Sequence, residues 1–279
     1  MAVLLSVLWG ANPVVVKLGL LDAPPIRLAW MRFLIGGVVI VLWAWLSGRF
    51  QGFRIARSER FPLLGVGVLL AVQSGVVNVG THLTSAAHVV VILNSYAVHT
   101  VVLAHFMIPG DRLTPRRLAG VLIAYAGIFL LFARELAGAG FSLLGDTLTF
   151  AGALLLAERT IYLARAVQRL DPVKLLLAQA LIGGTILLIV SLAVEPAPTN
   201  WTLRLAGSIA YQGVLITGFN FSVNLWLLKY YRPSALAPWL LTQPLFGVIA
   251  AALFTGDPLT LDLILASLAV AAGIGLAGR

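Results

Sequence analysis

The chain contains no cysteine and few charged residues, and these two absences exclude several classes of protein. Without cysteine there is no disulfide framework, no thiolate metal site and no cysteine nucleophile. Charged residues make up 10% of the 279 residues, whereas a soluble domain carries about 25%. Hydrophobic residues make up 60%, which is more apolar surface than a water-soluble fold of this size can bury. The sequence therefore predicts an integral membrane protein.

The net charge of +9 does not indicate nucleic-acid binding, because the basic residues lie in short gaps between long apolar runs. Most of the 19 Lys and Arg residues fall in alternate gaps, whereas the other gaps hold only Arg27, Arg134 and Arg204. Lys and Arg accumulate in cytoplasmic loops, so this bias predicts that both termini are cytoplasmic. We expect the positive charge to contact membrane lipids, and we expect no nucleic-acid partner.

Long apolar runs of roughly 20 residues predict ten transmembrane helices. The runs do not alternate between polar and apolar residues, as barrel strands would. The predicted spans are residues 2–21, 27–47, 61–81, 85–108, 115–133, 143–164, 173–194, 204–228, 233–255 and 260–278. The first run has no basic start and carries Asn12, Pro13 and Lys17, so we interpret it as a helix and not as a signal peptide. The predicted fold class is an all-α membrane protein.

A five-residue motif occurs twice, which indicates an internal repeat. Gly110-Asp111-Arg112-Leu113-Thr114 recurs 146 residues later as Gly256-Asp257-Pro258-Leu259-Thr260. The predicted domains are two five-helix repeats, residues 1–134 and 135–279. Because five is odd, the second repeat enters the membrane from the opposite side, as in secondary transporters with a substrate site near the midplane. The alternative is a duplication that only enlarged the helix bundle.

Several segments resemble one transporter family. Trp9-Gly10-Ala11-Asn12 with Lys17, and Pro25-Ile26-Arg27-Leu28-Ala29-Trp30-Met31-Arg32-Phe33, resemble the first two helices of EamA-type exporters in the drug/metabolite transporter superfamily. Leu241-Thr242-Gln243-Pro244-Leu245-Phe246 resembles their ninth helix. The chain is most similar to aromatic amino acid exporters of bacterial inner membranes. The resemblance implies a multi-pass location in the inner (plasma) membrane and export of amino acids. Both copies of the repeated motif carry Asp (Asp111, Asp257) where the family usually has Glu.

Polar and aromatic side chains inside the predicted spans are the candidates for a substrate path, because they cost free energy when they face lipid. The candidate substrate-binding residues are Asn12, Trp30, Gln73, Asn78, His82, Asn94, Tyr96, His99, Asn224, Trp239 and Gln243. We expect Tyr96 and Trp239 to form apolar walls. Asn94 and Gln243 would hydrogen-bond the ammonium and carboxylate groups of a substrate. For each of these residues, packing between helices is the alternative role.

The charged residues inside the spans need partners, and Asp22 is the candidate counter-ion for Lys17 and Arg32. No span contains an isolated central Asp or Glu that could relay a proton. A histidine could carry a proton instead, although the sequence does not show coupling. No phosphate-binding, zinc or nucleophile motif occurs, so we expect no metal, no cofactor and no enzymatic activity.

These observations predict a secondary exporter of small metabolites, amino acids including aromatic ones, which works by alternating access through a central cavity between the repeats. Its partners would be the small-molecule substrate and membrane lipids, and the oligomeric state is open, with a monomer compatible. The first alternative is an exporter of drugs or other amphipathic solutes. Further alternatives are a passive channel and an intramembrane enzyme, for which His88, His99 and His105 are the only candidates.

Overall fold

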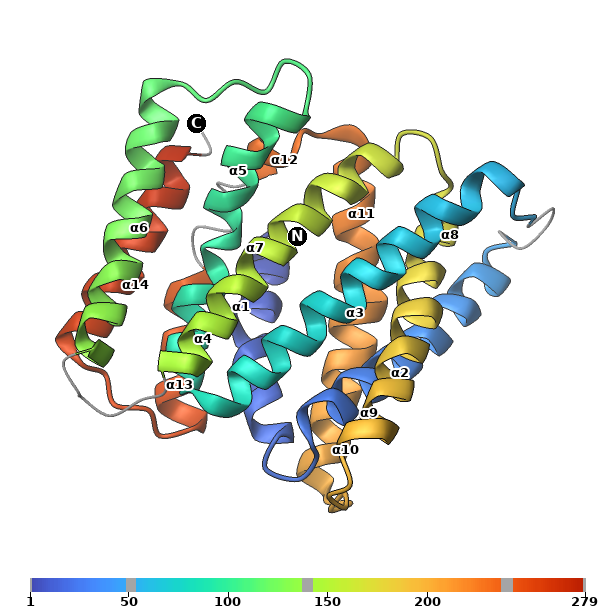
Figure 1. The fold of residues 1–279 in the computed structure, drawn as a ribbon, viewed down its shortest axis with the longest axis horizontal. Helices are drawn as coiled ribbons and strands as arrows, with labels where there is room; N and C mark the ends of the chain where they lie inside the picture. Colours follow the sequence, from blue (N-terminus) through green and yellow to red (C-terminus); the bar gives the residue numbers. More distant parts are fainter. Residues whose placement is uncertain (1, 49–53, 137–142, 237–242, 278–279) are drawn as a thin grey trace. The chain divides into compact units, whose positions relative to one another are not determined.

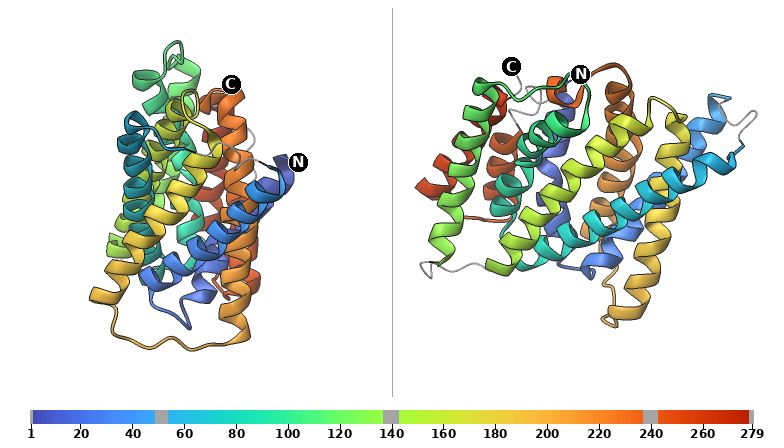
Figure 2. Two further views of the ribbon diagram at one scale, coloured as in Figure 1. Left: turned by 90° about the vertical axis from the view of Figure 1, so that its right-hand side faces the viewer. Right: turned by 45° about the horizontal axis from the view of Figure 1, so that its top comes forward.

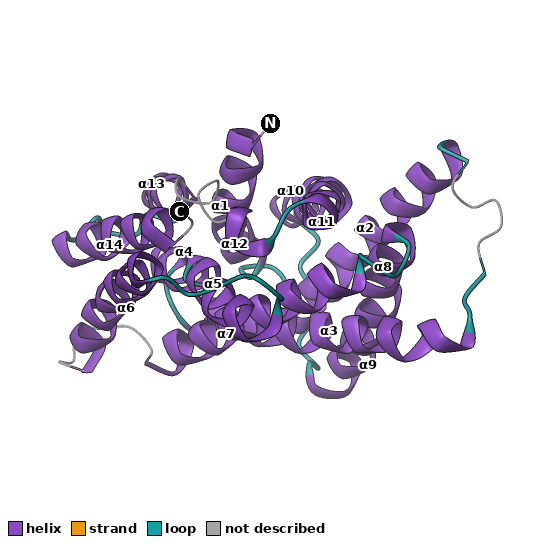
Figure 3. Cartoon of the chain, turned by 90° about the horizontal axis from the view of Figure 1, so that it is seen from above, coloured by secondary structure: helices purple, strands orange, loops and turns teal. Residues whose placement is uncertain are grey.

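The structure is a computed structural model that describes residues 2–48, 54–136, 143–236 and 243–277. Within these ranges every regular element is a helix, and none is a strand (Figure 3). A helix satisfies its backbone N–H and C=O groups internally, which suits long runs of apolar residues in lipid. The prediction of an all-α fold is confirmed for the described residues.

Each predicted span coincides with helical residues. In chain order, the first helices are α1 (Ala2–Gly19), α2 (Pro25–Leu46), η1 (Arg57–Glu59), α3 (Arg60–Leu83), α4 (Ala86–Asn94), α5 (Tyr96–Met107), α6 (Pro115–Leu136) and α7 (Leu143–Ala166). They are followed by α8 (Pro172–Ala178), η2 (Gln179–Gly183), α9 (Gly184–Val194), α10 (Leu203–Ala210), η3 (Tyr211–Asn220), α11 (Phe221–Tyr230), α12 (Pro233–Leu236), α13 (Gln243–Phe254) and α14 (Leu261–Ala277).

Three of the predicted helices contain an irregularity that the sequence pattern does not reveal. The predicted span 85–108 is divided at Ser95, whose hydroxyl donates to the carbonyl of Ile92 at 2.6 Å. The spans 173–194 and 204–228 each contain a π-helical segment, η2 and η3. Such segments occur frequently at functional sites in helical proteins.

The chain folds into two compact units. Unit 1 comprises residues 1–17, 76–161 and 231–279, and unit 2 comprises residues 18–75 and 162–230. Each unit takes segments from both halves of the sequence. The compact units are therefore a different division of the chain from the sequence repeats, which stay a prediction.

The two copies of the repeated motif share one backbone feature. Gly110 and Gly256 both have positive φ angles, 78° and 73°. This region of conformational space is open to glycine and strained for residues with a Cβ. The aspartates that follow have different partners: Asp111 accepts from Arg117 at 2.6 Å, whereas Asp257 accepts from the backbone N–H of Ala87 at 2.7 Å.

In unit 1, α6 and α14 lie side by side (Figure 1, Figure 2). Glycines on both helices allow this approach: a Cβ atom built on Gly273 would lie 2.5 Å from the carbonyl oxygen of Gly120. A Cβ on Gly127 would likewise lie 2.9 Å from the carbonyl oxygen of Ala266. Small residues at such contacts let helix backbones approach closely in lipid.

In unit 2, α2 packs against α9 and the π-helical segment η3. A Cβ on Gly36 would clash with the side chain of Thr217, and one on Gly213 would lie 2.6 Å from Cβ of Ile35. Phe33 is fully buried in the core of this unit, which also includes Leu70. Glycine contacts therefore fix the packing of both units.

Many large apolar side chains on the helices are exposed, including Phe129 at 70% and Leu192 at 74%. Five helical segments in the described residues are long and apolar enough to cross a membrane: Pro25–Leu46, Arg57–Leu83, Ala86–Met107, Leu143–Ala166 and Pro172–Val194. Exposed apolar surface on such helices suits contact with lipid tails. A crossing by all ten predicted spans stays a prediction.

Gly273→Ala is expected to lower the thermal unfolding temperature of the protein in detergent. The added methyl group would meet the backbone of Gly120, and overpacking of this kind costs roughly 1–3 kcal/mol. The matched control is Gly207→Ala in α10, because a Cβ there has nothing within 4 Å. The control is expected to leave the unfolding temperature unchanged or to raise it slightly. Equal effects of the two changes would contradict the packing described for α6 and α14.

Candidate functional site

Three helices of unit 1 that carry predicted site residues pack closely together. A Cβ on Gly10 of α1 would lie 2.7 Å from the backbone carbonyl oxygen of Gln243, the first residue of α13. A Cβ on Gly247 of α13 would lie 2.5 Å from the side chain of Val90 in α4. The glycines therefore bring α1, α4 and α13 into direct contact.

Helices α4 and α13 run in opposite directions, because Asp257, which follows α13, binds the N–H of Ala87 at the start of α4. Asn94 lies one turn beyond Val90 in α4, and Gln243 lies one turn before Gly247 in α13. Residues four apart share a helix face. The contact between Val90 and Gly247 therefore places the amides of Asn94 and Gln243 at the same level on facing helices.

Three buried amide oxygens in this region accept no hydrogen bond from any described residue: Oδ1 of Asn12, Oδ1 of Asn94 and Oε1 of Gln243. The orientation of the Asn94 amide is fixed, because its Nδ2 donates to the carbonyl of Val90 at 2.7 Å. Buried polar atoms in proteins are nearly always hydrogen-bonded, so unsatisfied acceptors call for a donor from a ligand or water. We call Asn12, Asn94 and Gln243 the amide cluster.

Two aromatic rings of unit 1 pack against each other in a core formed by residues of α3, α4, α5 and α7. The rings of Trp9 and Tyr96 are 6.4 Å apart at their centroids and inclined by 53°. Trp9 precedes Asn12 by three positions on α1, so the two side chains share one side of that helix. Trp9 was not among the predicted site residues, although its spacing from Asn12 could have identified it. The rings are part of this apolar core, which also contains Val77 and Leu156.

The remaining predicted residues of unit 1 have different surroundings. His99 is buried and packs against the rings of Tyr125 (centroids 5.3 Å apart) and Phe150 (5.2 Å). This aromatic contact favours a packing role. Asn78 is fully buried in α3, whereas the side chain of His82 is exposed near the end of that helix.

Three predicted residues lie in unit 2. Trp30 packs against the core around Phe33, and its Nε1 donates to no described residue. Gln73 is buried in α3, and Asn224 is half-buried in α11. Trp239 lies outside the described residues.

Unit 2 also buries Arg32, which the sequence did not assign to the site. Its guanidinium donates to Oγ of Ser74 at 3.0 Å and to Oε1 of Gln212 at 3.4 Å, and it lies 4.6 Å from the ring centroid of Phe33. All three neighbours are neutral, and within the described residues no carboxylate pairs with Arg32. The cation is thus held by hydrogen bonds and by the aromatic ring.

The prediction that Asp22 is the counter-ion of Lys17 and Arg32 is wrong. Asp22 forms a bidentate pair with Arg204, at 2.7 and 2.9 Å, and accepts from Thr202 at 2.8 Å. The sequence could not reveal this partner because it lies 182 positions along the chain. The hydrogen bonds from Arg204 and Thr202 hold the pKa of Asp22 below its ordinary value of 3.8.

The described residues contain no group of three or more His, Asp or Glu side chains that could hold a metal ion. The profile of the EamA-like transporter family matches residues 1–133 and 143–279. The chain belongs to this family. The apolar helices described above agree with membership, and this EamA protein is a multi-pass membrane transporter with a small-molecule substrate.

Relatives of this EamA protein extend over nearly its whole length. The Escherichia coli (strain K12) protein named "Probable amino-acid metabolite efflux pump" is 27% identical, with 93% of this chain and 87% of that protein covered. "Uncharacterized transporter YvbV" of Bacillus subtilis (strain 168) is 26% identical, with 98% and 88% covered. A solved crystal structure has the same fold, with a TM-score of 0.75 and 19% identity over 99% of this chain and 94% of that chain.

Asp22→Asn is expected to destabilise unit 2 at neutral pH and to have no effect at strongly acidic pH. The folded state lowers the pKa of Asp22, so its stabilising contribution is present above pH 3.8 and is lost as the pH falls through the lower folded value. Unfolding temperatures of both proteins in detergent across this range provide the measurement. Arg204→Gln should give the same loss at neutral pH, and the double variant no further loss. Additive losses would contradict a direct pair.

Proposed function

We propose that this EamA protein is a secondary transporter of the inner membrane that exports small metabolites, with amino acids, including aromatic ones, as its substrates. Its family consists of transporters, and the name of its Escherichia coli relative refers to amino-acid metabolite efflux. No catalytic step is part of this proposal.

The amide cluster is the observation that carries the substrate class. Asn94 and Gln243 lie at one level on facing helices, and Oδ1 of Asn94, Oε1 of Gln243 and Oδ1 of Asn12 on α1 are all acceptors without a donor among the described residues. An ammonium group supplies three N–H donors and a positive charge. The rings of Trp9 and Tyr96, on α1 and α5 of the same unit, would suit both a cation and an apolar side chain. A free amino acid combines these properties.

The proposed mechanism is alternating access between two inverted five-helix repeats, with both termini in the cytoplasm and ten membrane crossings. The repeated Gly-Asp motif and the charge bias of the loops support this topology. Two copies of one fold in opposite orientations have similar energies when open to either side, so a modest motion exchanges access. The substrate path would run through a central cavity between the repeats.

The direct test is transport by the purified protein in liposomes. Labelled phenylalanine should enter liposomes preloaded with unlabelled phenylalanine at a saturable rate, whereas a labelled sugar and a cationic dye should not. Equal saturable uptake of the dye would instead support the exporter of drugs and other amphipathic solutes. Uptake without saturation or counterflow would indicate a channel, and no flux above empty liposomes would refute transport.

Asn94→Ala is expected to raise the phenylalanine concentration for half-maximal exchange by about 10-fold. This corresponds to the loss of one hydrogen bond to a charged group, about 1.5 kcal/mol. The matched control is Thr100→Val in α5, because Thr100 is buried but its hydroxyl already donates to the carbonyl of Tyr96 at 2.7 Å. The control should transport normally. An unchanged half-maximal concentration in Asn94→Ala would remove the amide cluster from the substrate path.

A further inference from the structure

Arg32 in α2 is a buried cation whose side chain turns into unit 2. The residue is 7% exposed, and its guanidinium donates to Oγ of Ser74 in α3 and to Oε1 of Gln212 in η3. An arginine near a helix end usually extends its charged group toward water. This guanidinium instead lies between helices, against two neutral groups that are themselves buried. Anchoring of the helix end in water therefore does not explain Arg32.

The guanidinium is held in position but is not fully satisfied. Arginine has five N–H donors in a planar fork. Nε of Arg32 is buried and donates to no described residue. The bond from Nη1 to Gln212 measures 3.4 Å, whereas hydrogen bonds between a cation and a carboxylate measure about 2.7–2.9 Å. The structure thus leaves room on this cation for a stronger acceptor.

The other unsatisfied buried side-chain atom of unit 2 is also a donor on α2. Among the described residues of this unit, the two such atoms are Nε of Arg32 and Nε1 of Trp30. Trp30 packs against the apolar cluster that contains Phe33, and the guanidinium lies 4.6 Å from the centroid of the Phe33 ring. Buried donors without acceptors indicate a ligand that supplies acceptor oxygens.

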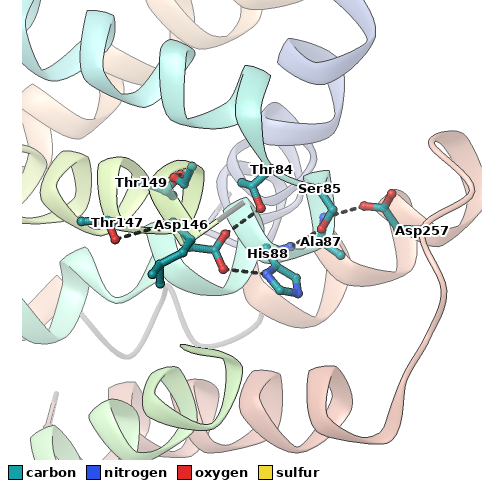
Figure 4. Close-up of polar contacts among 10 residues, drawn as sticks. Thr84, Ser85, Ala87, His88, Asp146, Thr147, Thr149 and Asp257 are labelled. Atoms are coloured by element: carbon teal, nitrogen blue, oxygen red, sulfur yellow. Dashed lines mark hydrogen bonds and ion pairs between the residues drawn. The ribbon is translucent and has the colours of Figure 1, made fainter. Parts of the chain in front are cut away.

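Buried carboxylates of this chain, by comparison, have partners with ionisable side chains. Asp22 pairs with Arg204 in unit 2. In unit 1, Oδ2 of Asp146 in α7 lies 2.8 Å from Nδ1 of His88 in α4 (Figure 4). No described carboxylate pairs with Arg32. A charge within a membrane span is costly without a partner, and such a residue indicates a functional site.

Arg204 shows how a guanidinium of this chain binds a carboxylate. Its Nε and Nη2 donate to the two oxygens of Asp22 at 2.7 and 2.9 Å. On Arg32 the same two nitrogens are Nε, which has no described acceptor, and Nη2, which donates to the hydroxyl of Ser74 at 3.0 Å. Nη2 carries a second N–H. The planar fork of arginine matches the two oxygens of a carboxylate.

The contact with Gln212 can give way to a ligand at small cost. Gln212 lies in the π-helical segment η3 (Tyr211–Asn220), and such segments are frequent at functional sites. Its Nε2 donates to Oγ of Ser208 at 2.8 Å, which orients the amide without Arg32. A carboxylate oxygen is a stronger acceptor for a cation than an amide oxygen at 3.4 Å. Ser74 and Phe33 would keep the guanidinium in place.

We propose that Arg32 binds the carboxylate group of the transported substrate. Nε and Nη2 donate to the two carboxylate oxygens, and no covalent bond changes. The inference rests on the proposed transport function and adds a group that the substrate must carry. It concerns unit 2 alone and needs nothing from the amide cluster. Inorganic phosphate also offers oxygen acceptors, but it has no apolar part to suit the apolar cluster around Phe33.

The first experiment uses the unmodified protein in liposomes. Exchange of labelled phenylalanine is measured with unlabelled phenylalanine or phenylalaninamide as competitor, at a mildly acidic pH where both carry an ammonium group. The amide keeps the ring and lacks the carboxylate. It should need an at least 10-fold higher concentration for half-inhibition, roughly the loss of one hydrogen bond to a charged group. Inorganic phosphate at the same concentrations should not compete.

The second experiment compares variants by the ratio of the two half-inhibition concentrations, which does not depend on the amount of folded protein. Arg32→Gln should weaken competition by phenylalanine about 10-fold or more and leave phenylalaninamide unchanged. Arg32→Lys keeps the charge without the fork and should give an intermediate ratio. Arg27→Gln is the matched control in α2, because Arg27 donates to the carbonyls of Glu195 and Ala197. It should keep the ratio of the unmodified protein.

Ligand-induced stabilisation in detergent gives the same comparison for a variant that does not transport. Phenylalanine should raise the unfolding temperature of the unmodified protein more than phenylalaninamide does, and Arg32→Gln should remove the difference. Equal competition by both compounds in the unmodified protein would overturn the carboxylate inference and leave transport intact. An unchanged ratio in Arg32→Gln, or competition by phosphate, would also overturn it. Absence of saturable exchange in the unmodified protein would overturn both proposals.

Discussion

Glycines lie at close contacts between helices of this chain. Gly273 contacts Gly120, and Gly247 contacts Val90. Lipid tails are as apolar as leucine side chains, so burial of apolar surface does not by itself hold transmembrane helices together. Close van der Waals contact between backbones does so instead. The same contacts set the positions of neighbouring side chains, and the contact between α4 and α13 fixes the level of Asn94 and Gln243.

Several of the few charged residues on the described helices and loops bind the ends of helices. The carboxylate of Glu195 accepts from the N–H groups of Ile26 and Arg27, both at 2.7 Å, at the start of α2. Asp257 does the same for α4, and Lys17 satisfies carbonyls at the end of α3. The first N–H and last C=O groups of a helix have no partner within it, and in apolar surroundings each costs several kcal/mol if left alone. These three charged side chains therefore supply hydrogen-bond partners to backbone groups that have none within their own helix.

The amide cluster and the pair formed by His88 and Asp146 are buried polar groups of unit 1 that do not act on helix ends in this way. In the amide cluster, buried oxygens lack donors from the described residues, which suits a ligand that brings N–H groups. In the pair, Oδ2 of Asp146 lies 2.8 Å from Nδ1 of His88, and Oδ1 accepts from the hydroxyl of Thr84. The first feature supports the proposal that the substrate carries an amine. Both lie in unit 1, on helices held by glycine contacts.

The sequence alone determined the helical fold, the helix positions and the family, because apolar run length and short motifs are local properties of the chain. It also predicted Asn12, Asn94 and Gln243 as candidate site residues, since amides are costly in an apolar helix wherever it packs. Only the tertiary structure decided the partners: Asp22 with Arg204, His88 with Asp146, and Trp9 with Tyr96. The break at Ser95 and the π-helical segments also appeared only there. Pairing depends on which helix faces meet, and that is set by close backbone packing between residues far apart in the sequence.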